Sequence, residues 1–256
     1  MASYFQRHLD GPGGVRELMV LAIPMIVSQA ADTVMLFFYR LFLSALGKEH
    51  LAACMGGGLT SFMMLTFFIG LINYVNPLTA QYLGSGQKSR CSTAGAQGII
   101  VALLSAPIVL GLIPIGQWML RHAGHDALQT QLEVEYFTIL GLGCVLPLLR
   151  TALSSFFAGI GRTRVVMAAN LTAMVVNIGA NYVLIFGHMG FPALGMRGAA
   201  YGTLTGSAVG TLILLGMYYS GPVHEQFDTR RRLRIARDVI RRLFRFGIPG
   251  GIEFFM

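Results

Sequence analysis

One carboxylate lies deep inside a long apolar run of the sequence. Asp32 falls near the middle of the run 17–45, and it is the only acid away from the run ends in the six apolar runs that we expect before residue 220. If the run crosses a membrane, an acid there is costly and indicates function. Asp32 either binds or relays a cation, or it is a structural acid paired with a base.

Polar side chains in other apolar runs could face the same space. Asn177 and Asn181 stand one helical turn apart, and Thr203 belongs to the GAAYGT block that follows. An amide oxygen can bind Na+ but cannot carry a proton, and the alternative role for such amides is interhelical hydrogen bonding, about 0.6 kcal/mol each. Four further polar residues are predicted to line one cleft: Ser28, Gln29, Asn73 and Tyr74.

Other chemistry finds no support in the sequence. It has no GxxxxGK[ST] loop for a nucleotide, and its histidines form no convincing catalytic or metal site, so we expect no enzyme and no cofactor. The net charge of +8 comes from basic residues in short gaps between apolar runs, which argues against a nucleic-acid partner. Energy for any transport must then come from an ion gradient or from a partner.

The elements that carry these side chains are long enough to cross a bilayer. Hydrophobic residues make up 54% of the chain and charged residues 12%, with a mean hydropathy of +0.63. A membrane helix needs about 20 apolar residues. Continuous runs favour helices over strands, and internal prolines mark kinks. The predicted fold is an all-α polytopic bundle, with spans at roughly 17–45, 51–76, 94–120, 135–158, 165–187 and 198–219.

Lysine and arginine set the expected orientation. With the N-terminus inside, the cytoplasmic segments hold thirteen basic residues and the outer loops only three, which are Lys48, Arg121 and Arg197. Such a bias predicts a cytoplasmic N-terminus in a bacterial inner membrane, and Trp118 suits an anchor at the outer interface.

The chain is expected to divide into four parts. These are a cytoplasmic N-terminus (1–16), a six-helix lobe (17–220), a basic cytoplasmic linker (221–242) and the start of a seventh helix (243–256). In the linker region Leu233, Ile235, Ile240 and Leu243 alternate with arginines, which predicts an amphipathic helix on the inner surface. Its charge either sets topology alone or also recognises anionic membrane lipids.

Two repetitive patterns bear on assembly. The segment RRLFRFGIPGGIEFFM can be laid on RELMVLAIPMIVSQAA with Pro249 over Pro24, as if a second copy of the lobe began there. The chain would then be a fragment or a truncated product that lacks its second lobe. In the sixth span, glycines recur every four residues, which predicts a smooth face for close helix packing or sliding: Gly198, Gly202, Gly206 and Gly210.

Four blocks, in this order and spacing, resemble the multidrug and toxic compound extrusion family, MATE. They are AIP followed by RLFLSALGKEHLAA, then NPLTAQYLGSGQKSR, then FFAGIGRTRVVM, then NIGANYVLIFG with GMRGAAYGT. The resemblance covers residues 16–220. It implies one of two six-helix lobes that rock between outward and inward states and export cationic or amphipathic drugs in exchange for Na+ or H+.

The resemblance also assigns a cation site, from which this sequence departs. A first-helix acid usually stands eight residues before the glycine that matches Gly47, and here that position is Tyr39. Asp32 lies seven residues earlier, two turns away on the same helix face. Asn177, Asn181 and Thr203 match the rest of the cluster, although the family often has Asp where Asn181 stands. The expected cluster is Asp32, Tyr39, Asn177, Asn181 and Thr203.

Three functions remain open at this point. A drug exporter is the first. The same superfamily also contains flippases for lipid-linked glycans, which should line the lobe with arginine and lysine, and here Arg150 is the main candidate. The third is a truncated product that inserts but is inactive alone.

Overall fold

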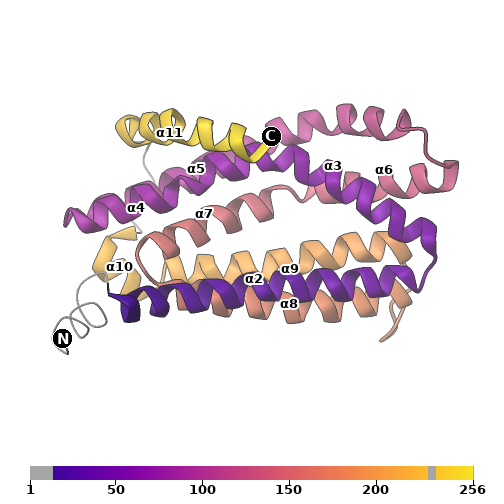
Figure 1. Cartoon of the computed structure of the whole chain (residues 1–256), viewed down its shortest axis with the longest axis horizontal. Helices are drawn as coiled ribbons and strands as arrows, with labels where there is room; N and C mark the ends of the chain where they lie inside the picture. The colour runs from indigo at the N-terminus through magenta and orange to yellow at the C-terminus, as the bar shows by residue number, and fades with distance from the viewer. Residues whose placement is uncertain (1–13, 230–234, 256) are drawn as a thin grey trace, which may run out of the picture.

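The computed structural model describes residues 14–229 and 235–255, and in these residues all regular structure is helical. Figure 1 shows the helices in chain order. Their bounds are α2 Val15–Ser44, α3 Lys48–Asn73, α4 Val75–Gly84, α5 Lys88–Arg121, α6 Ala127–Leu142, α7 Val145–Gly159, α8 Thr163–Phe186, α9 Gly195–Tyr218, α10 Gly221–Phe227 and α11 Arg237–Phe255.

The described part of the chain holds six candidate membrane spans, as predicted, when one bent pair of helices is counted as a single span. Five spans are single long apolar stretches, with α3 and α4 together forming the stretch Lys48–Gly84. The sixth is the pair α6 and α7, bent by 51° at Gly143 and Cys144. Pro147 lies in the first turn of α7, as a proline at a kink should. Pro24, Pro107 and Pro114, in contrast, lie inside helices that continue past them.

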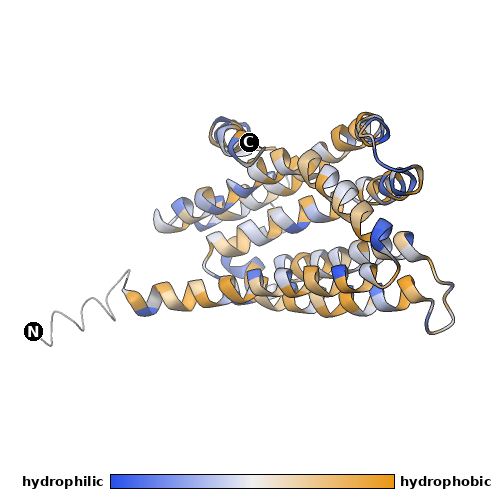
Figure 2. Cartoon of the chain, turned by 45° about the vertical axis from the view of Figure 1, so that its right-hand side comes forward, coloured by the Kyte–Doolittle hydropathy of each residue, from blue (hydrophilic) through white to orange (hydrophobic). Residues whose placement is uncertain are grey.

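The helices run back and forth along one long axis (Figure 1). The α4–α5, α7–α8 and α9–α10 connections lie at the end where α2 begins, and the other connections between spans lie at the opposite end. Large apolar side chains such as Ile26, Phe37 and Leu59 are exposed, and apolar residues colour much of the outside of the helices in Figure 2. An apolar exterior is what a bundle surrounded by lipid requires.

The largest core cluster lies around Phe156 of α7. This side chain is fully buried, and its ring centroid lies 5.0 Å from that of Tyr218 and 6.1 Å from that of Phe227. The hydroxyl of Tyr218 donates a hydrogen bond to the carbonyl of Ser92 at 3.1 Å, so its polar end is satisfied inside the core. The cluster joins α3, α4, α5, α7, α8, α9, α10 and α11.

The glycine face predicted for the sixth span is confirmed as a packing surface between α9 and α8. A Cβ at Gly206 would stand 2.7 Å from the Cβ of Asn177, and one at Gly198 would overlap the carbonyl oxygen of Leu184. A Cβ at Gly202 would overlap the side-chain oxygen of Asn181. The backbones therefore meet as closely as small residues in membrane interfaces allow.

The segment after the sixth span, predicted to be a linker, contains a short helix packed against the bundle and the first turns of a longer helix. Its first seven residues form α10, whose Val223 and Phe227 are buried, and a hydrogen bond of 2.6 Å joins Arg162 to Gln226. The next helix, α11, begins at Arg237, six residues before the expected start at 243. Asp238 favours the earlier start because an acid in the first turn complements the helix dipole. Leu233 and the N-terminal residues 1–13 lie outside the described residues.

α11 packs along α3 through glycines on both helices. Gly247 and Gly251 are buried, as are Val239 and Leu243 at the same four-residue spacing. A Cβ at Gly70 would stand 2.7 Å from the Cα of Gly251. The two helix backbones are therefore in direct contact.

Candidate functional site

Asp32 is paired with a base from another helix. Its Oδ1 lies 3.8 Å from Nη2 of Arg150 on α7, and the same Nη2 donates a hydrogen bond of 2.8 Å to Oδ1 of Asn170 on α8. The Arg150 side chain also packs against α9, since a Cβ at Gly210 would stand 3.5 Å from its Nε. One guanidinium therefore links α2, α7 and α8 beside a glycine of α9.

The two partners differ in their access to solvent. The Asp32 side chain is 46% exposed, whereas that of Arg150 is 19% exposed. At 3.8 Å and with half of the carboxylate exposed, the pair is a weak ion pair. Asn170 holds the guanidinium more closely than Asp32 does. The arrangement can therefore release the carboxylate to a competing cation while Arg150 stays in place.

Asn177 and Asn181 lie against the glycine face of α9. Nδ2 of Asn181 donates to Oδ1 of Asn177 at 2.9 Å, and Nδ2 of Asn177 donates to the carbonyl of Gly202 at 3.4 Å. Both side chains are 2% exposed or less. Oδ1 of Asn181 has no hydrogen-bond partner among the described residues. The amides thus form a short buried chain with one spare acceptor.

Tyr39 occupies the position at which the acid was expected, and it is buried among aromatic and sulfur groups. Its ring centroid lies 6.2 Å from that of Tyr136, and its side chain also contacts Cys54. Tyr136 in turn contacts Thr203. The structure therefore joins Tyr39 to Thr203 through a residue that the sequence analysis did not select.

The predicted cluster is divided between two levels of the bundle. Asp32 lies at the level of Gly210, while Asn177 and Asn181 lie at the levels of Gly206 and Gly202. Eight residues of α-helix, the separation of Gly202 and Gly210, rise about 12 Å.

The four predicted lining residues fall in different surroundings. Ser28 is buried, and its hydroxyl has no hydrogen-bond partner among the described residues, whereas Gln29 is exposed. Oδ1 of Asn73 accepts a hydrogen bond of 3.3 Å from Ser155, and the ring of Tyr74 stacks on Phe246 of α11 with centroids 5.5 Å apart. Asn73 and Tyr74 line a cavity of about 520 Å³ against α11, and the two α2 residues are not among those that line it.

A second interior carboxylate is present that the sequence analysis missed. Glu133 of α6 is fully buried. Its Oε1 accepts a hydrogen bond from Gln129 Nε2 at 2.8 Å, and its Oε2 lies 2.9 Å from Nδ1 of His125. Asp32 is therefore not the only interior acid. The expected span began at 135, but α6 begins at Ala127. The spacing of Gln129, Glu133 and Tyr136 on one helix face was the signal that could have revealed it.

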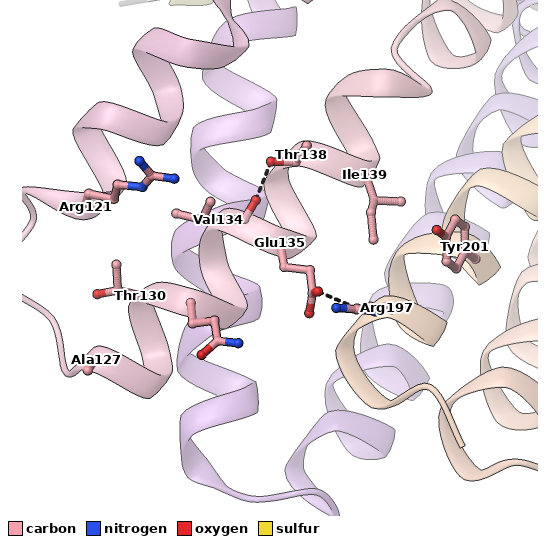
Figure 3. A pocket seen from close by; sticks show the side chains of 10 residues that line it. Arg121, Ala127, Thr130, Val134, Glu135, Thr138, Ile139, Arg197 and Tyr201 are labelled. Carbon is pink, nitrogen blue, oxygen red and sulfur yellow. Dashed lines mark hydrogen bonds and ion pairs between the residues drawn. The ribbon is translucent and has the colours of Figure 1, made fainter. Parts of the chain in front are cut away.

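The opposite face of α6 carries an ordinary ion pair. In Figure 3, Glu135 of α6 points to Arg197 of α9, and the two form an ion pair at the rim of a cavity of about 610 Å³. Arg121 of α5 lines the same cavity. The Arg197 side chain is 59% exposed, so this pair contributes about 1 kcal/mol or less to stability.

Comparison with known proteins identifies the family of this chain. A family model described as MatE matches residues 24–183. A probable multidrug resistance protein NorM from Synechocystis is 30% identical over 244 residues, which are 93% of this chain and 52% of that protein. Multidrug resistance protein MdtK from Photorhabdus laumondii is 25% identical over 238 residues, 91% of this chain and 52% of that protein. The chain thus spans about half the length of these relatives.

Solved structures show the same fold. One is described as the outward-facing conformation of a multidrug resistance MATE family transporter of the MOP superfamily. It is 21% identical to this chain with a TM-score of 0.84, and the aligned region covers 93% of this chain and 52% of that protein. A MOP superfamily transporter from Pyrococcus furiosus has a TM-score of 0.81, 21% identity, and covers 98% of this chain and 54% of its own. With the family model matching more than half of its residues, this chain belongs to the MatE family of membrane transporters.

Proposed function

We propose that the chain forms the first lobe of a secondary-active multidrug exporter, a cation/drug antiporter that moves cationic or amphipathic compounds outward in exchange for Na+ or H+. Its relatives are named multidrug resistance proteins, which supports the substrate class. The observation that carries the proposal is the pairing of Asp32 with Arg150, a weak link between helices that an entering cation can break.

The coupling follows from competition for one carboxylate. When Na+ or H+ binds to Asp32, Arg150 loses that partner but keeps Asn170, so the ion-pair link between α2 and α7 is broken. A ligand shifts a conformational equilibrium only if it binds the two states differently. The cation binds better where Asp32 is free of Arg150, which biases the lobe toward one of its two rigid-body states. Tyr39, Asn177, Asn181 and Thr203 support this change as uncharged groups.

The proposal includes a second lobe and a defined orientation in the membrane. Because the relatives are about twice as long, the substrate path requires a second six-helix lobe from the same protein. The bias of basic residues supports a cytoplasmic N-terminus and a bacterial inner membrane as part of the proposal. At the end of the bundle where α2 begins, Arg241, Arg242 and Arg245 line a cavity of about 770 Å³ that suits an anionic lipid headgroup.

The flippase alternative is weaker on structural grounds. A flippase for an anionic lipid-linked glycan needs free cations along its path, but Arg150 already contacts Asp32 and Asn170. A product that is inactive without its second lobe stays the third alternative. Sequence downstream of Met256 that encodes five or six further spans would remove it.

Asp32→Asn in the full-length protein tests the proposal. Neutralising the carboxylate removes both the ion pair and the cation ligand, so drug efflux and its dependence on pH or Na+ should fall about tenfold or more. Efflux of a cationic dye from cells, measured over a range of pH and Na+, checks this. Asp126→Asn, an exposed acid at the start of α6, is the control and should change little. Unchanged efflux and unchanged ion dependence in Asp32→Asn would exclude the proposal.

A further inference from the structure

Glu133 lies in a site that is built around its carboxylate. The side chain is fully buried, yet it lines a cavity of about 780 Å³ between α2, α3 and α6. A Cβ at Gly56 of α3 would overlap Oε1 of Glu133, so a glycine is required opposite the acid. His125 and Gln129 bind one oxygen each. Burying a carboxylate in this way is costly unless it is paired or protonated.

His125 gives the buried acid a route to the aqueous phase. It belongs to the connection between α5 and α6, at the end of the bundle opposite the start of α2, and its side chain is 37% exposed. Imidazole is the side chain that ordinarily changes charge between about pH 5 and 8. One partner of the contact is therefore accessible to water, while the other is enclosed.

The other charged and titratable groups around Glu133 come from each packed helix. α2 contributes Tyr39 and Arg40 to the cavity, α3 contributes Cys54, and α6 contributes Tyr136. Arg40 is the only lysine or arginine among the residues that line this cavity. On the other face of α6, Glu135 is paired with Arg197, and Arg121 lines that separate cavity.

We propose that His125 and Glu133 form a proton-binding site at the end of the bundle opposite the start of α2. With one proton between them, the imidazole and the carboxylate share a hydrogen bond. A second proton adds to a carboxylate oxygen of Glu133, giving a neutral acid beside an imidazolium. The neutral acid can still accept from the imidazolium, but the contact between Nδ1 and Oε2 is no longer a hydrogen bond between opposite charges and is therefore weaker. Proton uptake thereby weakens the tie between the α5–α6 connection and α6.

This site deepens the proposed function, on which its role in transport rests. In a lobe whose expected acid position holds Tyr39, the pair supplies a second ion-binding carboxylate, and it selects H+ as the ion. Glu133 lines the same cavity as Tyr39 and Tyr136, and Tyr136 contacts Thr203. Proton binding itself can be measured without transport.

The test is infrared difference spectroscopy of the purified chain in lipid nanodiscs over a range of pH. The wild type should develop a protonated-carboxyl band as the pH falls. Glu133→Gln should remove this band, and Glu135→Gln, the same change two residues away on the same helix, should keep it. His125→Gln, at an exposed position that should not prevent folding, should let the band persist to higher pH, because a buried acid without a charged partner stays neutral.

The outcomes separate the site from the proposed function. A band that survives in Glu133→Gln, or that His125→Gln leaves unchanged, would overturn the proton site, whatever the protein transports. Efflux that is independent of ions in the full-length protein would overturn the proposed function while leaving the spectroscopic result intact. If Glu133→Gln does not fold, the pH at which the band forms in His125→Gln still decides the question.

Discussion

Gly202→Val is expected to prevent α8 and α9 from packing. A Cβ at this position would overlap the side chain of Asn181 and stand 3.0 Å from its backbone nitrogen, and backbone cannot rotate away as a flexible side chain can. Overpacking a core costs about 1–3 kcal/mol, and contact with backbone places this change at or above the upper end. Thermal unfolding in detergent and the yield of monodisperse protein measure the loss.

The control for this change lies on the same helix. A Cβ at Gly216 would meet nothing within 4 Å, so Gly216→Val makes the same substitution in α9 without the clash. It should unfold near the wild-type temperature. If the two variants lose stability equally, the cost arises from valine in the helix and the close approach of α8 and α9 is not its cause.

Asn181→Asp is expected to be the most damaging single-atom exchange in the lobe at neutral pH. Asn181 is 1% exposed, and its Nδ2 donates to the side-chain oxygen of Asn177. A carboxylate would place negative charge against that oxygen without a described cation nearby. A buried charge without a partner costs about 3–5 kcal/mol. The neutral acid regains an O–H donor, so stability should recover as the pH is lowered from 8 toward about 5.

Asn170→Asp provides the matched comparison. The substitution is the same and lies on the same helix, but Oδ1 of Asn170 accepts a hydrogen bond from Arg150 at 2.8 Å. A carboxylate there meets a guanidinium and forms a charge-assisted hydrogen bond. Its unfolding temperature should stay close to that of the wild type at neutral pH. Equal destabilisation of both variants would show that the local partner does not decide the outcome.

The parts of the fold that could be predicted depend on patterns local in sequence. Six spans follow from the length of apolar runs, and the glycine face of α9 follows from a four-residue spacing, and both are present in the structure. A proline in the sequence, however, predicts a break in the helix only in some cases. Pro147 follows a bend of 51°, whereas Pro107 and Pro114 lie within one helix, because neighbouring groups decide whether a freed carbonyl bends the chain.

The site depended on contacts between distant segments, which no local pattern reveals. The sequence alone leaves open whether Asp32 is paired, because its partner Arg150 comes from a helix more than a hundred residues away. Glu133 was missed for a different reason. The expected start of this span rests on hydropathy, and the polar first turns of α6 lower the mean hydropathy there. The helix is therefore predicted to begin eight residues later than Ala127. Boundaries are decided by tertiary packing as much as by composition.

The glycine contact between α3 and α11 has a consequence for the order in which the molecule assembles. Gly70 and Gly251 meet directly, although they lie 181 residues apart in the sequence (251 − 70). Contacts between residues so far apart form slowly, because a long loop must close before they yield any stabilisation. During synthesis α3 therefore exposes an unoccupied glycine groove until α11 has emerged. The docking of α11 is then a late step, and it rests on a surface that the earlier spans have already shaped.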